Sequence, residues 1–466
     1  MPAQTAAMAV TLKCSTRLFI SFLFRFSLVA DAAERGDATS VAIPSPSLKP
    51  LVQARIDAEY PSLFALYKDL HLHPELSFQE AKTSARFADE LRKAGLEVTT
   101  GVGRFGVVGV LKNGNGPTVL MRTDLDGLPV KEETGLAYAS QDLEKDPDGK
   151  EVPMMHACGH DIHITCAAGT ARVLYQLRDR WQGKLVIIGQ PAEERGGGAR
   201  AMIKDGLFQR FPKPDVCLAF HDSAELPAGT LGYAAGFDSA NVDSIDITVK
   251  GVGGHGAYPH KTKDPIVLAA QIILGLQTIV SREIEPGEPA VVTVGSIHGG
   301  TKHNIIPDDV KLQLTVRSYS DAVRGQLLAG ISRIVRGEAV AAGVPEDRMP
   351  EVNISDDHTP AGYNDPATAE RLAKTFRAWF GESRVTKRKP TMGGEDFSEF
   401  GRTEDKIPIC MFAVGAVNPE SIQASQKTGK PLPSLHSSRW APLPEPTIKT
   451  GVAATCAAVL EMMAGR

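Results

Sequence analysis

A series of short apolar segments that end at polar residues constrains the fold most strongly. The segments FGVVGVL, PTVLMRTD, GKLVIIGQ and DVCLAFHD, between residues 105 and 222, are rich in β-branched residues and bounded by Gly, Pro or Asp, as strands usually are. Stretches with helical apolar spacing at 162–178 and 198–208 separate the last three. Alternating strands and helices predict an α/β fold with helices on the faces of a central sheet. Such sheets bind ligands where their strands end.

The middle of the chain follows a different pattern. From about 237 to 351, the strands SIDITVKG, AVVTVGSI, DVKLQLTVRSY and PEVNIS and helices at 265–283 and 321–342 occur in the order β-α-β-β-α-β. This order predicts a ferredoxin-like unit. We expect an inserted second domain at 237–351, with the first domain divided into 51–236 and 352–466.

Composition indicates a globular protein that acts on a small molecule. The length of 466 residues suggests two or three domains, and 42% hydrophobic with 23% charged residues is typical of globular chains. The net charge of −4 does not favour binding to nucleic acid or to an anionic membrane surface, because both are negatively charged.

The N-terminus resembles a secretory signal peptide. Lys13 and Arg17 precede the apolar run LFISFLF, and the small-residue sequence ADAA follows. We therefore expect a signal peptide at 1–33, a Pro- and Ser-rich linker at 34–50, and a periplasmic or secreted protein without stable membrane insertion. Arg25 interrupts the apolar run, so a membrane anchor or a wrongly assigned start are the alternatives.

The segment HACGHDIH predicts metal binding. A cysteine taken alone is most often a small buried hydrophobic residue. Here Cys158 lies among His156, His160 and His163, and so many imidazoles are costly to satisfy by packing alone. Cys158 and His160, two residues apart in an expected extended loop, are the candidate ligands. A redox or metal-storage role is less favoured, because no second cysteine lies nearby.

The segment QPAEER places two carboxylates directly after an apolar strand. Most adjacent glutamates simply lie in solvated loops. At a strand end followed by a glycine triplet, Glu194 can bind metal while Glu193 remains free to act as a general base.

Three further residues at strand ends or in loops are weaker candidates. His221 ends the segment VCLAFH, and His436 lies in PSLHSSRW near the C-terminus. Each alone is more often a structural histidine. Asp124, at the end of PTVLMRTD, is a candidate to orient a ligand imidazole from behind.

A set of motifs then occurs in a fixed order along the chain. They are HLHPELSFQE, RTDLDGLP, MHACGHDIHIT, QPAEERGGGA, GGHGAYPH, HNIIP, MGGEDFSEF and LHSSR. They resemble the metal-dependent aminoacylase and carboxypeptidase superfamily, in the branch of hippurate hydrolase, bacterial N-acyl-amino-acid amidohydrolases and plant indole-acetyl-amino-acid hydrolases. The resemblance runs from about residue 50 to the end. It implies a central mixed sheet flanked by helices, as in zinc exopeptidases, with the ferredoxin-like unit inserted as a lid domain.

The resemblance also implies roles for individual residues. A two-metal centre is expected from Cys158, His160, Glu194, His221 and His436. Glu193 is implied as general base and acid. Asp222 follows His221 where relatives usually have an apolar residue, so an additional carboxylate is expected near the metals, either as a hydrogen-bond acceptor or as an added charge.

The lid residues carry a second set of implied roles. The resemblance implies that His255 stabilises the oxyanion, from its own chain or from a partner subunit. Asn304 and Arg317 match positions that contact the carbonyl or carboxylate of the substrate. Closure of the lid is expected to bring these residues over the substrate. A homodimer through the lid, or a higher homo-oligomer, is the expected assembly.

These observations predict a metal-dependent amidohydrolase that cleaves N-acyl amino acids. Two divalent ions are expected, with zinc or manganese favoured and cobalt or nickel as alternatives. The same-class alternative is a dipeptidase or carboxypeptidase. The alternative from another class is a non-catalytic binding protein on the same fold.

Overall fold

The computed structural model describes residues 45–464, so the expected signal peptide and most of the expected linker lie outside the described residues. The last linker residues are helical. Ser45–Leu48 forms a 3-10 turn that leads into α1 (Lys49–Leu72). Leu48 is buried in the core, and Pro50 lies in the first turn of α1, where proline is favoured. The prediction of a linker up to residue 50 is therefore wrong for these residues.

A mixed sheet forms the centre of the larger part of the chain, as predicted. Its strands are, in spatial order, β1 (Glu97–Val102), β2 (Gly106–Asn113), β6 (Gly183–Gln190), β3 (Thr118–Asp124), β7 (Val216–Pro227), β18 (Ile409–Val417), β8 (Leu231–Tyr233) and β17 (Val385–Lys387). The four strands β6, β3, β7 and β18 run parallel. β1, β2 and β8 are antiparallel to their neighbours β2, β6 and β18.

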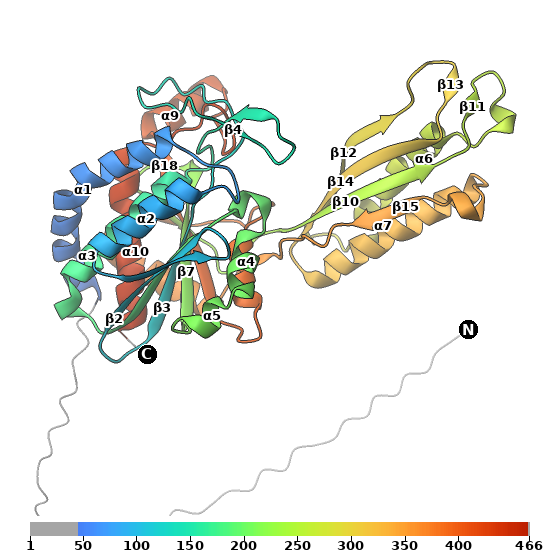
Figure 1. Ribbon diagram of the computed structural model, residues 1–466. Coiled ribbons are helices and arrows are strands. Elements are labelled where there is room, and N and C mark those ends of the chain that lie inside the picture. The colour runs from blue at the N-terminus through green and yellow to red at the C-terminus, as the bar shows by residue number, and fades with distance from the viewer. Residues whose placement is uncertain (1–44, 465–466) are drawn as a thin grey trace, which may run out of the picture. The chain divides into compact units, whose positions relative to one another are not determined.

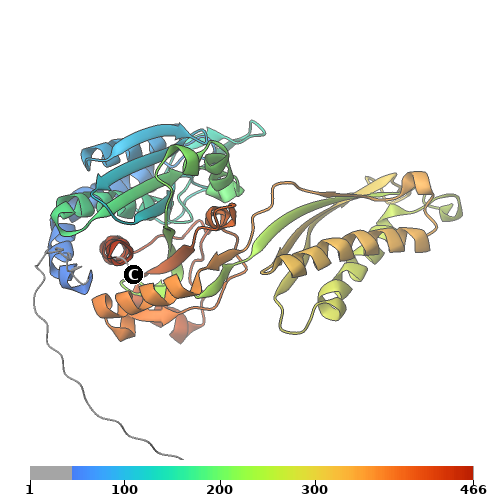
Figure 2. The same ribbon diagram turned by 90° about the horizontal axis from the view of Figure 1, so that it is seen from below.

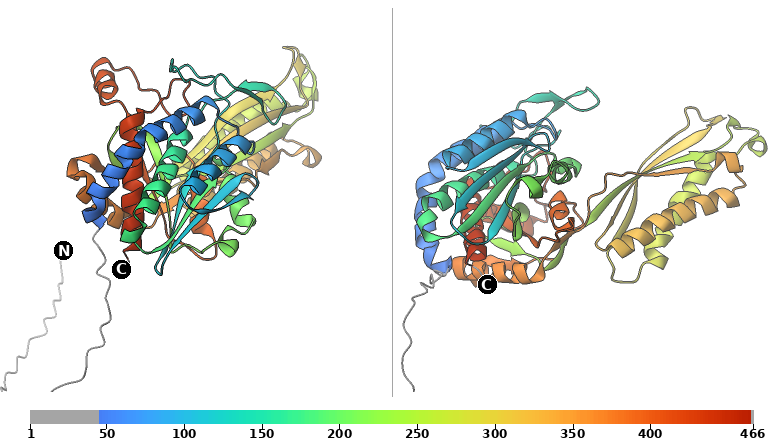
Figure 3. Two further views of the ribbon diagram at one scale, coloured as in Figure 1. Left: turned by 60° about the vertical axis from the view of Figure 1, so that its left-hand side comes forward. Right: turned by 60° about the horizontal axis from the view of Figure 1, so that its bottom comes forward.

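Helices cover both faces of this sheet (Figures 1 and 2). One face packs against α1, α2 (Ala81–Lys93), α3 (His160–Gln176), α8 (Pro366–Phe380) and α10 (Pro444–Met463), and the other against α4 (Gly198–Lys204), α5 (Leu207–Arg210) and the 3-10 segment η8 (Asp396–Arg402). Helices α1, α3 and α10 also contact one another (Figure 3). Strand β6 shows why both faces are covered: Leu185 and Ile187 join the first core, whereas Val186 and Ile188 join the second.

A separate antiparallel sheet forms the lid, with the predicted β-α-β-β-α-β order. Its strands are β12 (Ala290–Gly299), β14 (Asp309–Ser318), β10 (Asn241–Lys250) and β15 (Glu351–Ile354), in that spatial order. Helices α6 (Pro265–Thr278) and α7 (Asp321–Ala341) share one apolar core with this sheet. The helix expected at 265–283 is α-helical only to Thr278 and continues as a π-helical turn, Ile279–Glu283.

Short strands complete the structure. β11 (Gly254–His255) pairs with β13 (Ile305–Ile306), a ribbon that the sequence did not predict. β9 (Gly236–Ser239) pairs with β16 (Gly362–Asn364), so the lid sheet itself begins only at Asn241. The division into domains at 237 and 351 stays a prediction. The remaining strands are the hairpin β4 (Leu143–Lys145) and β5 (Glu151–Pro153), and the remaining α-helix is α9 (Pro419–Thr428); short 3-10 turns connect several of the elements.

Candidate metal centre

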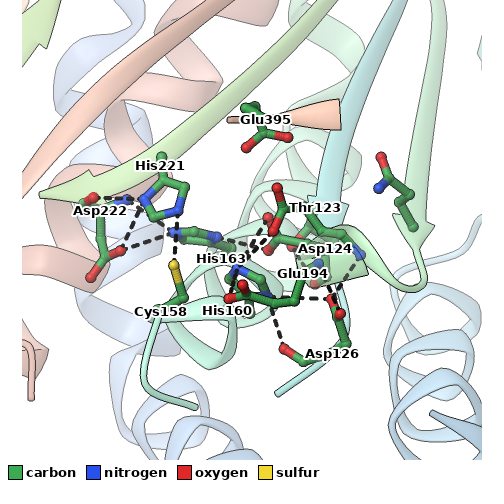
Figure 4. Close-up of polar contacts among 12 residues, drawn as sticks. Thr123, Asp124, Asp126, Cys158, His160, His163, Glu194, His221, Asp222 and Glu395 are labelled. Carbon is green, nitrogen blue, oxygen red and sulfur yellow. Dashed lines mark hydrogen bonds and ion pairs between the residues drawn. The ribbon is translucent and has the colours of Figure 1, made fainter. Parts of the chain in front are cut away.

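The candidate metal centre lies at the carboxyl edge of the parallel strands (Figure 4). Asp124 is the last residue of β3, and the 3-10 turn Glu193–Arg195 (η3) follows β6. His221 lies inside β7, which continues to Pro227, so the prediction that it ends its strand is wrong. Strand β3 stops pairing with β7 at Arg122. His221 therefore lies just past the last residue pair that joins β3 to β7, level with Asp124 at the end of β3, and this brings its side chain to the site.

Helix α3 supplies His160 as its first residue. The sequence predicted an extended loop through Cys158 and His160, with the helix from 162, but the helix begins two residues earlier. Gly159 ends the loop with a φ of +75°. A Cβ atom at Gly159 would lie 2.4 Å from Oδ2 of Asp222. Only glycine therefore permits both the backbone conformation and the close approach of β7.

The five residues expected to bind metal come together. They are Cys158, His160, Glu194, His221 and His436. The Sγ atom of Cys158 lies 3.5 Å from Nε2 of His221 and 3.2 Å from Nε2 of His436. Nε2 of His160 lies 3.8 Å from Oε1 of Glu194, and Nε2 of His436 lies 3.4 Å from Oε2 of the same carboxylate. Residues from four separate parts of the chain thus form one cluster.

Main-chain oxygens orient two of these histidines. Nδ1 of His160 donates to the oxygen of Asp126 at 2.8 Å, and Nδ1 of His221 donates to the oxygen of Asp222 at 2.7 Å. Both Nε2 atoms are then left with a lone pair, as a metal ligand requires. Nε2 of His160 and Oε1 of Glu194 are buried and have no hydrogen-bond partner within residues 45–464.

The donor set fits divalent cations. Buried polar atoms without partners are costly unless something binds them, and a thiol with three imidazoles and a carboxylate is the chemistry of zinc and similar ions. Burial and the charge of Glu194 raise the pKa of the Cys158 thiol. A metal would therefore displace a proton from Cys158 when it binds.

Glu193, predicted to be the general base and acid and not a ligand, lies against the cluster beside His160 and Glu194. Its Oε2 atom lies 3.9 Å from Nε2 of His160. Burial raises the pKa of Glu193, and the charges of Glu395 and Glu194 raise it further. A carboxylate in such an environment takes up a proton more readily than an ordinary glutamate does.

Asp124 also lies beside the cluster, but its hydrogen bonds differ from those expected. Its Oδ1 accepts from Nδ1 of His163 at 2.8 Å, and its Oδ2 lies 3.7 Å from Nε2 of His160. His160 is instead oriented by the main-chain oxygen of Asp126, which accepts a hydrogen bond from Nδ1 of His160. The expected carboxylate of Asp222 does approach the centre, with Oδ1 3.2 Å from Nδ1 of His221.

A buried charge network, which the sequence did not predict, lies behind the centre. Arg122 donates to Asp124 at 2.6 Å, to Glu395 at 2.9 Å, to Asp396 at 3.2 Å and to Gln190 at 3.0 Å. It joins the ends of β3 and β6 to the loop that leads into η8. The sequence feature that pointed to these contacts is the motif MGGEDFSEF, which contains Glu395 and Asp396.

The three lid residues lie in two separate places. His255 in β11 pairs with Ile305, and the oxygen of Asn304 accepts from Gly256 at 2.9 Å, so His255 and Asn304 lie together. Arg317 lies in β14 opposite Val242, near the start of β10. β11 follows the far end of β10, a strand of 10 residues that spans about 30 Å. The structure therefore does not bring Arg317 together with His255 and Asn304 within one chain.

Comparison with known proteins agrees with this geometry. Residues 120–428 match the model of peptidase family M20/M25/M40. The chain is 36% identical to thermostable carboxypeptidase 1 of Saccharolobus solfataricus over 84% of its own length and 93% of that protein. It is 35% identical to N-acetyldiaminopimelate deacetylase of Leuconostoc citreum, over 80% and 92% of the two chains. The structure of the Bacillus subtilis YXEP protein, described as a dinuclear metal-binding peptidase, has a TM-score of 0.69 at 28% identity and covers 87% of this chain and 99% of that one. As its ordered motifs predicted, the chain belongs to peptidase family M20/M25/M40, a family of metal-dependent hydrolases.

Proposed function

We propose that this protein hydrolyses the amide bond of N-acyl amino acids to a carboxylic acid and a free amino acid. The convergence of Cys158, His160, Glu194, His221 and His436 beside a separate carboxylate, Glu193, carries the proposal. When bound there, two divalent ions, zinc or manganese in the first instance and cobalt or nickel as alternatives, supply Lewis-acid polarisation and acidify water.

Glu193 moves the proton in this proposal. It accepts a proton from the attacking water and returns it to the nitrogen of the leaving amino acid. The raised pKa of Glu193, caused by burial and then by the charges of Glu395 and Glu194, suits a group that must both accept and donate at neutral pH.

Arg317 binds the free carboxylate of the substrate. Its guanidinium is half-buried, and burial lowers its pKa. Its one hydrogen bond within residues 45–464 goes to the hydroxyl of Thr315, at 3.2 Å, and no carboxylate forms an ion pair with it there. A partly buried charge without a counter-ion is costly. A carboxylate of the substrate supplies the missing partner with good geometry.

His255 and Asn304 reach the substrate bound by a partner subunit. They lie at the end of the lid away from Arg317, about 30 Å along β10. At the near end, the N–H of Ala240 donates to the oxygen of Gly393 at 2.9 Å, two residues before Glu395, which Arg122 joins to Asp124. We therefore propose that one lid contributes to two metal centres: Arg317 acts at the centre of its own chain, and His255 acts at the centre of the partner subunit.

The lid surface supports a homodimer, with a higher homo-oligomer as the alternative. The segment Pro265–Glu283 is apolar enough to resemble a membrane span, yet Leu268, Ile272 and Leu276 pack in the lid core. The opposite side of α6 exposes Val267 and Leu274. Strand β12 is a free edge of the lid sheet. Apolar side chains beside a free strand edge are a typical surface for pairing with a second copy.

One experiment tests the proposed activity directly. Metal-reconstituted protein is assayed with a panel of N-acyl amino acids and dipeptides that share the same C-terminal residues. Preferred cleavage of the N-acyl amino acids supports the proposal. Preferred cleavage of dipeptides favours the carboxypeptidase alternative, which the similarity to thermostable carboxypeptidase 1 supports. Tight binding of these compounds without turnover would indicate a binding protein.

We also propose that the protein is exported. Lys13 and Arg17 before an apolar run, with small residues after it, support this proposal. Cell fractionation with N-terminal sequencing of the mature chain tests it. A cytoplasmic protein with its N-terminus intact would contradict it.

A further inference from the structure

The main-chain N–H groups of three successive residues, 192–194, donate hydrogen bonds to two buried carboxylates. The N–H of Ala192 donates to Oε1 of Glu80 at 2.7 Å. The N–H groups of Glu193 and Glu194 donate to Oδ1 and Oδ2 of Asp126, each at 3.1 Å. Both carboxylates are fully buried. The turn that carries both glutamates is therefore attached by its backbone to residues outside the ligand set.

Glu80 holds this turn in an unfavourable backbone conformation. Ala192 has a φ of +49°, which a residue with a Cβ adopts only at a cost. Oε1 of Glu80 also accepts from the N–H of Phe78 at 2.8 Å, and Phe78 has a φ of +61°. One carboxylate oxygen thus ties together two strained residues, one before α2 and one before Glu193.

Asp126 connects the same turn to a metal ligand. Its main-chain oxygen orients His160, while its carboxylate holds the backbone of Glu193 and Glu194. The hydroxyl of Ser77 donates to Oδ2 at 2.6 Å and fixes the carboxylate. Asp126 therefore sets the distance between His160 and the two glutamates.

We propose that Glu80 and Asp126 are positioning residues that aim Glu193 at the reacting water and Glu194 at the metals through the backbone of residues 192–194. The roles of Glu193 and Glu194 in this statement rest on the proposed function. Neither Glu80 nor Asp126 binds the metal or the substrate in this proposal. Groups behind the ligands commonly change metal affinity or activity by about 10-fold to 100-fold when they are removed.

The pattern of contacts predicts that the two carboxylates respond differently to amide substitution. In Glu80→Gln the amide oxygen can replace Oε1 and accept from both Phe78 and Ala192, because one oxygen carries both bonds. In Asp126→Asn either orientation turns an NH₂ group toward a main-chain N–H, because each oxygen accepts from one main-chain N–H. Glu80→Gln should be tolerated and Asp126→Asn should not.

The test compares Glu80→Gln, Glu80→Ala and Asp126→Asn with the wild type. Affinity for Zn²⁺ is measured by calorimetric titration of the metal-free full chain, and kcat and KM with the best substrate of the panel. We expect Asp126→Asn to weaken Zn²⁺ binding about 10-fold or more and to lower kcat about 100-fold, with KM changed less than about twofold. Glu80→Ala should lower kcat about 10-fold, and Glu80→Gln should remain within about twofold of the wild type.

A control changes an exposed carboxylate that accepts from a backbone N–H elsewhere in the fold. Asp215 accepts from the N–H of Thr118 at 2.7 Å, at the opposite end of β3. Asp215→Asn should leave Zn²⁺ affinity and kcat unchanged. If it lowers them as much as Asp126→Asn does, the effect is general destabilisation and the proposal is overturned.

Two further outcomes are decisive. If Asp126→Asn does not fold, judged by circular dichroism, the pair Glu80→Gln and Glu80→Ala decides: equal kcat values overturn the proposal, and a loss confined to Glu80→Ala supports it. Equal Zn²⁺ affinities of folded Asp126→Asn and the wild type also overturn it. The titration needs no substrate, so it separates a failure of this proposal from a failure of the proposed activity.

Discussion

Cys158 and His436 lie side by side although 278 positions separate them in the chain, with Sγ and Nε2 3.2 Å apart. The main-chain N–H of His436 donates to the oxygen of Ala157 at 2.8 Å. This hydrogen bond holds the C-terminal loop next to Cys158, the residue that follows Ala157. The contact between His436 and Cys158 brings a ligand from the C-terminal loop to the candidate metal centre. The thiol is also a neighbour of a second imidazole, because Nε2 of His221 lies 3.5 Å from it.

Replacing Cys158 by serine should weaken the binding of soft metals most. A thiolate favours zinc over manganese more strongly than a hydroxyl does. In Cys158→Ser we expect Zn²⁺ affinity to fall about 100-fold and Mn²⁺ affinity to fall about 10-fold or less. Competition titrations with a chelator measure both. Cys217→Ser, at a buried cysteine outside the cluster, is the control, and equal losses for the two metals would contradict the ligand assignment.

Replacing Glu193 by glutamine should remove proton transfer and keep the metals. Glutamine has nearly the same shape but cannot accept the proton of the attacking water. General acid–base groups typically contribute a factor of about 100 to 10,000, so kcat should fall by that amount while the metal content, measured by elemental analysis, stays at the wild-type value. Wild-type turnover by Glu193→Gln would show that another group is the base.

Replacing Arg317 by methionine should affect only substrates that carry a free carboxylate. The half-buried guanidinium has no acidic partner within residues 45–464, and losing its pairing with a substrate carboxylate should lower kcat/KM about 100-fold. The corresponding carboxamide substrates serve as the control, since they never formed the ion pair. An equal loss on both substrate types would place the carboxylate elsewhere.

Mixed dimers can decide which chain supplies His255. Glu193→Gln and His255→Ala should each be nearly inactive alone. If His255 acts on the partner's centre, a heterodimer of the two contains one intact centre, and a one-to-one mixture that has exchanged subunits should recover about a quarter of wild-type activity. If His255 acts on its own chain, both centres of the heterodimer are defective and mixing recovers nothing.

The stability of the metal-free protein should fall in alkaline solution because of His71. Burial lowers the pKa of His71, but hydrogen bonds to Asp161 and Glu132 outweigh this and raise it to about 10. Because the folded-state pKa lies above the unfolded value of about 6.5, this contribution is fully present below about pH 6.5 and is lost as the pH rises toward about 10. Urea unfolding of the wild type and His71→Gln at several pH values measures it. The two proteins should differ less at the alkaline end, and curves that stay parallel would contradict the prediction.

The regular elements were predictable because their signals are local. The apolar runs of β3 and β6, the helix α3 and the order of the lid elements follow from periodicity and turn residues within short windows. The metal-ligand cluster was predictable from motif resemblance, since His436 has no local signal that links it to Cys158.

Contacts made across the fold were not predictable in this way. His221 is expected to end a strand because Asp222 follows it, yet pairing with β18 carries β7 on to Pro227. The bonds of Arg122 to Glu395 and Asp396 join positions more than 270 residues apart. The separation of Arg317 from His255 depends on the length of β10, and the sequence around each residue carries no information on the distance between them.

The missing side chain of Gly159 governs the spacing of the whole centre. It lets β7 approach α3 so closely that a single added methyl group would collide with the carboxylate of Asp222. A chain that acquired alanine at this position would keep every ligand intact in its sequence, yet the backbone before His160 would be strained and the new methyl group would press on the carboxylate next to His221.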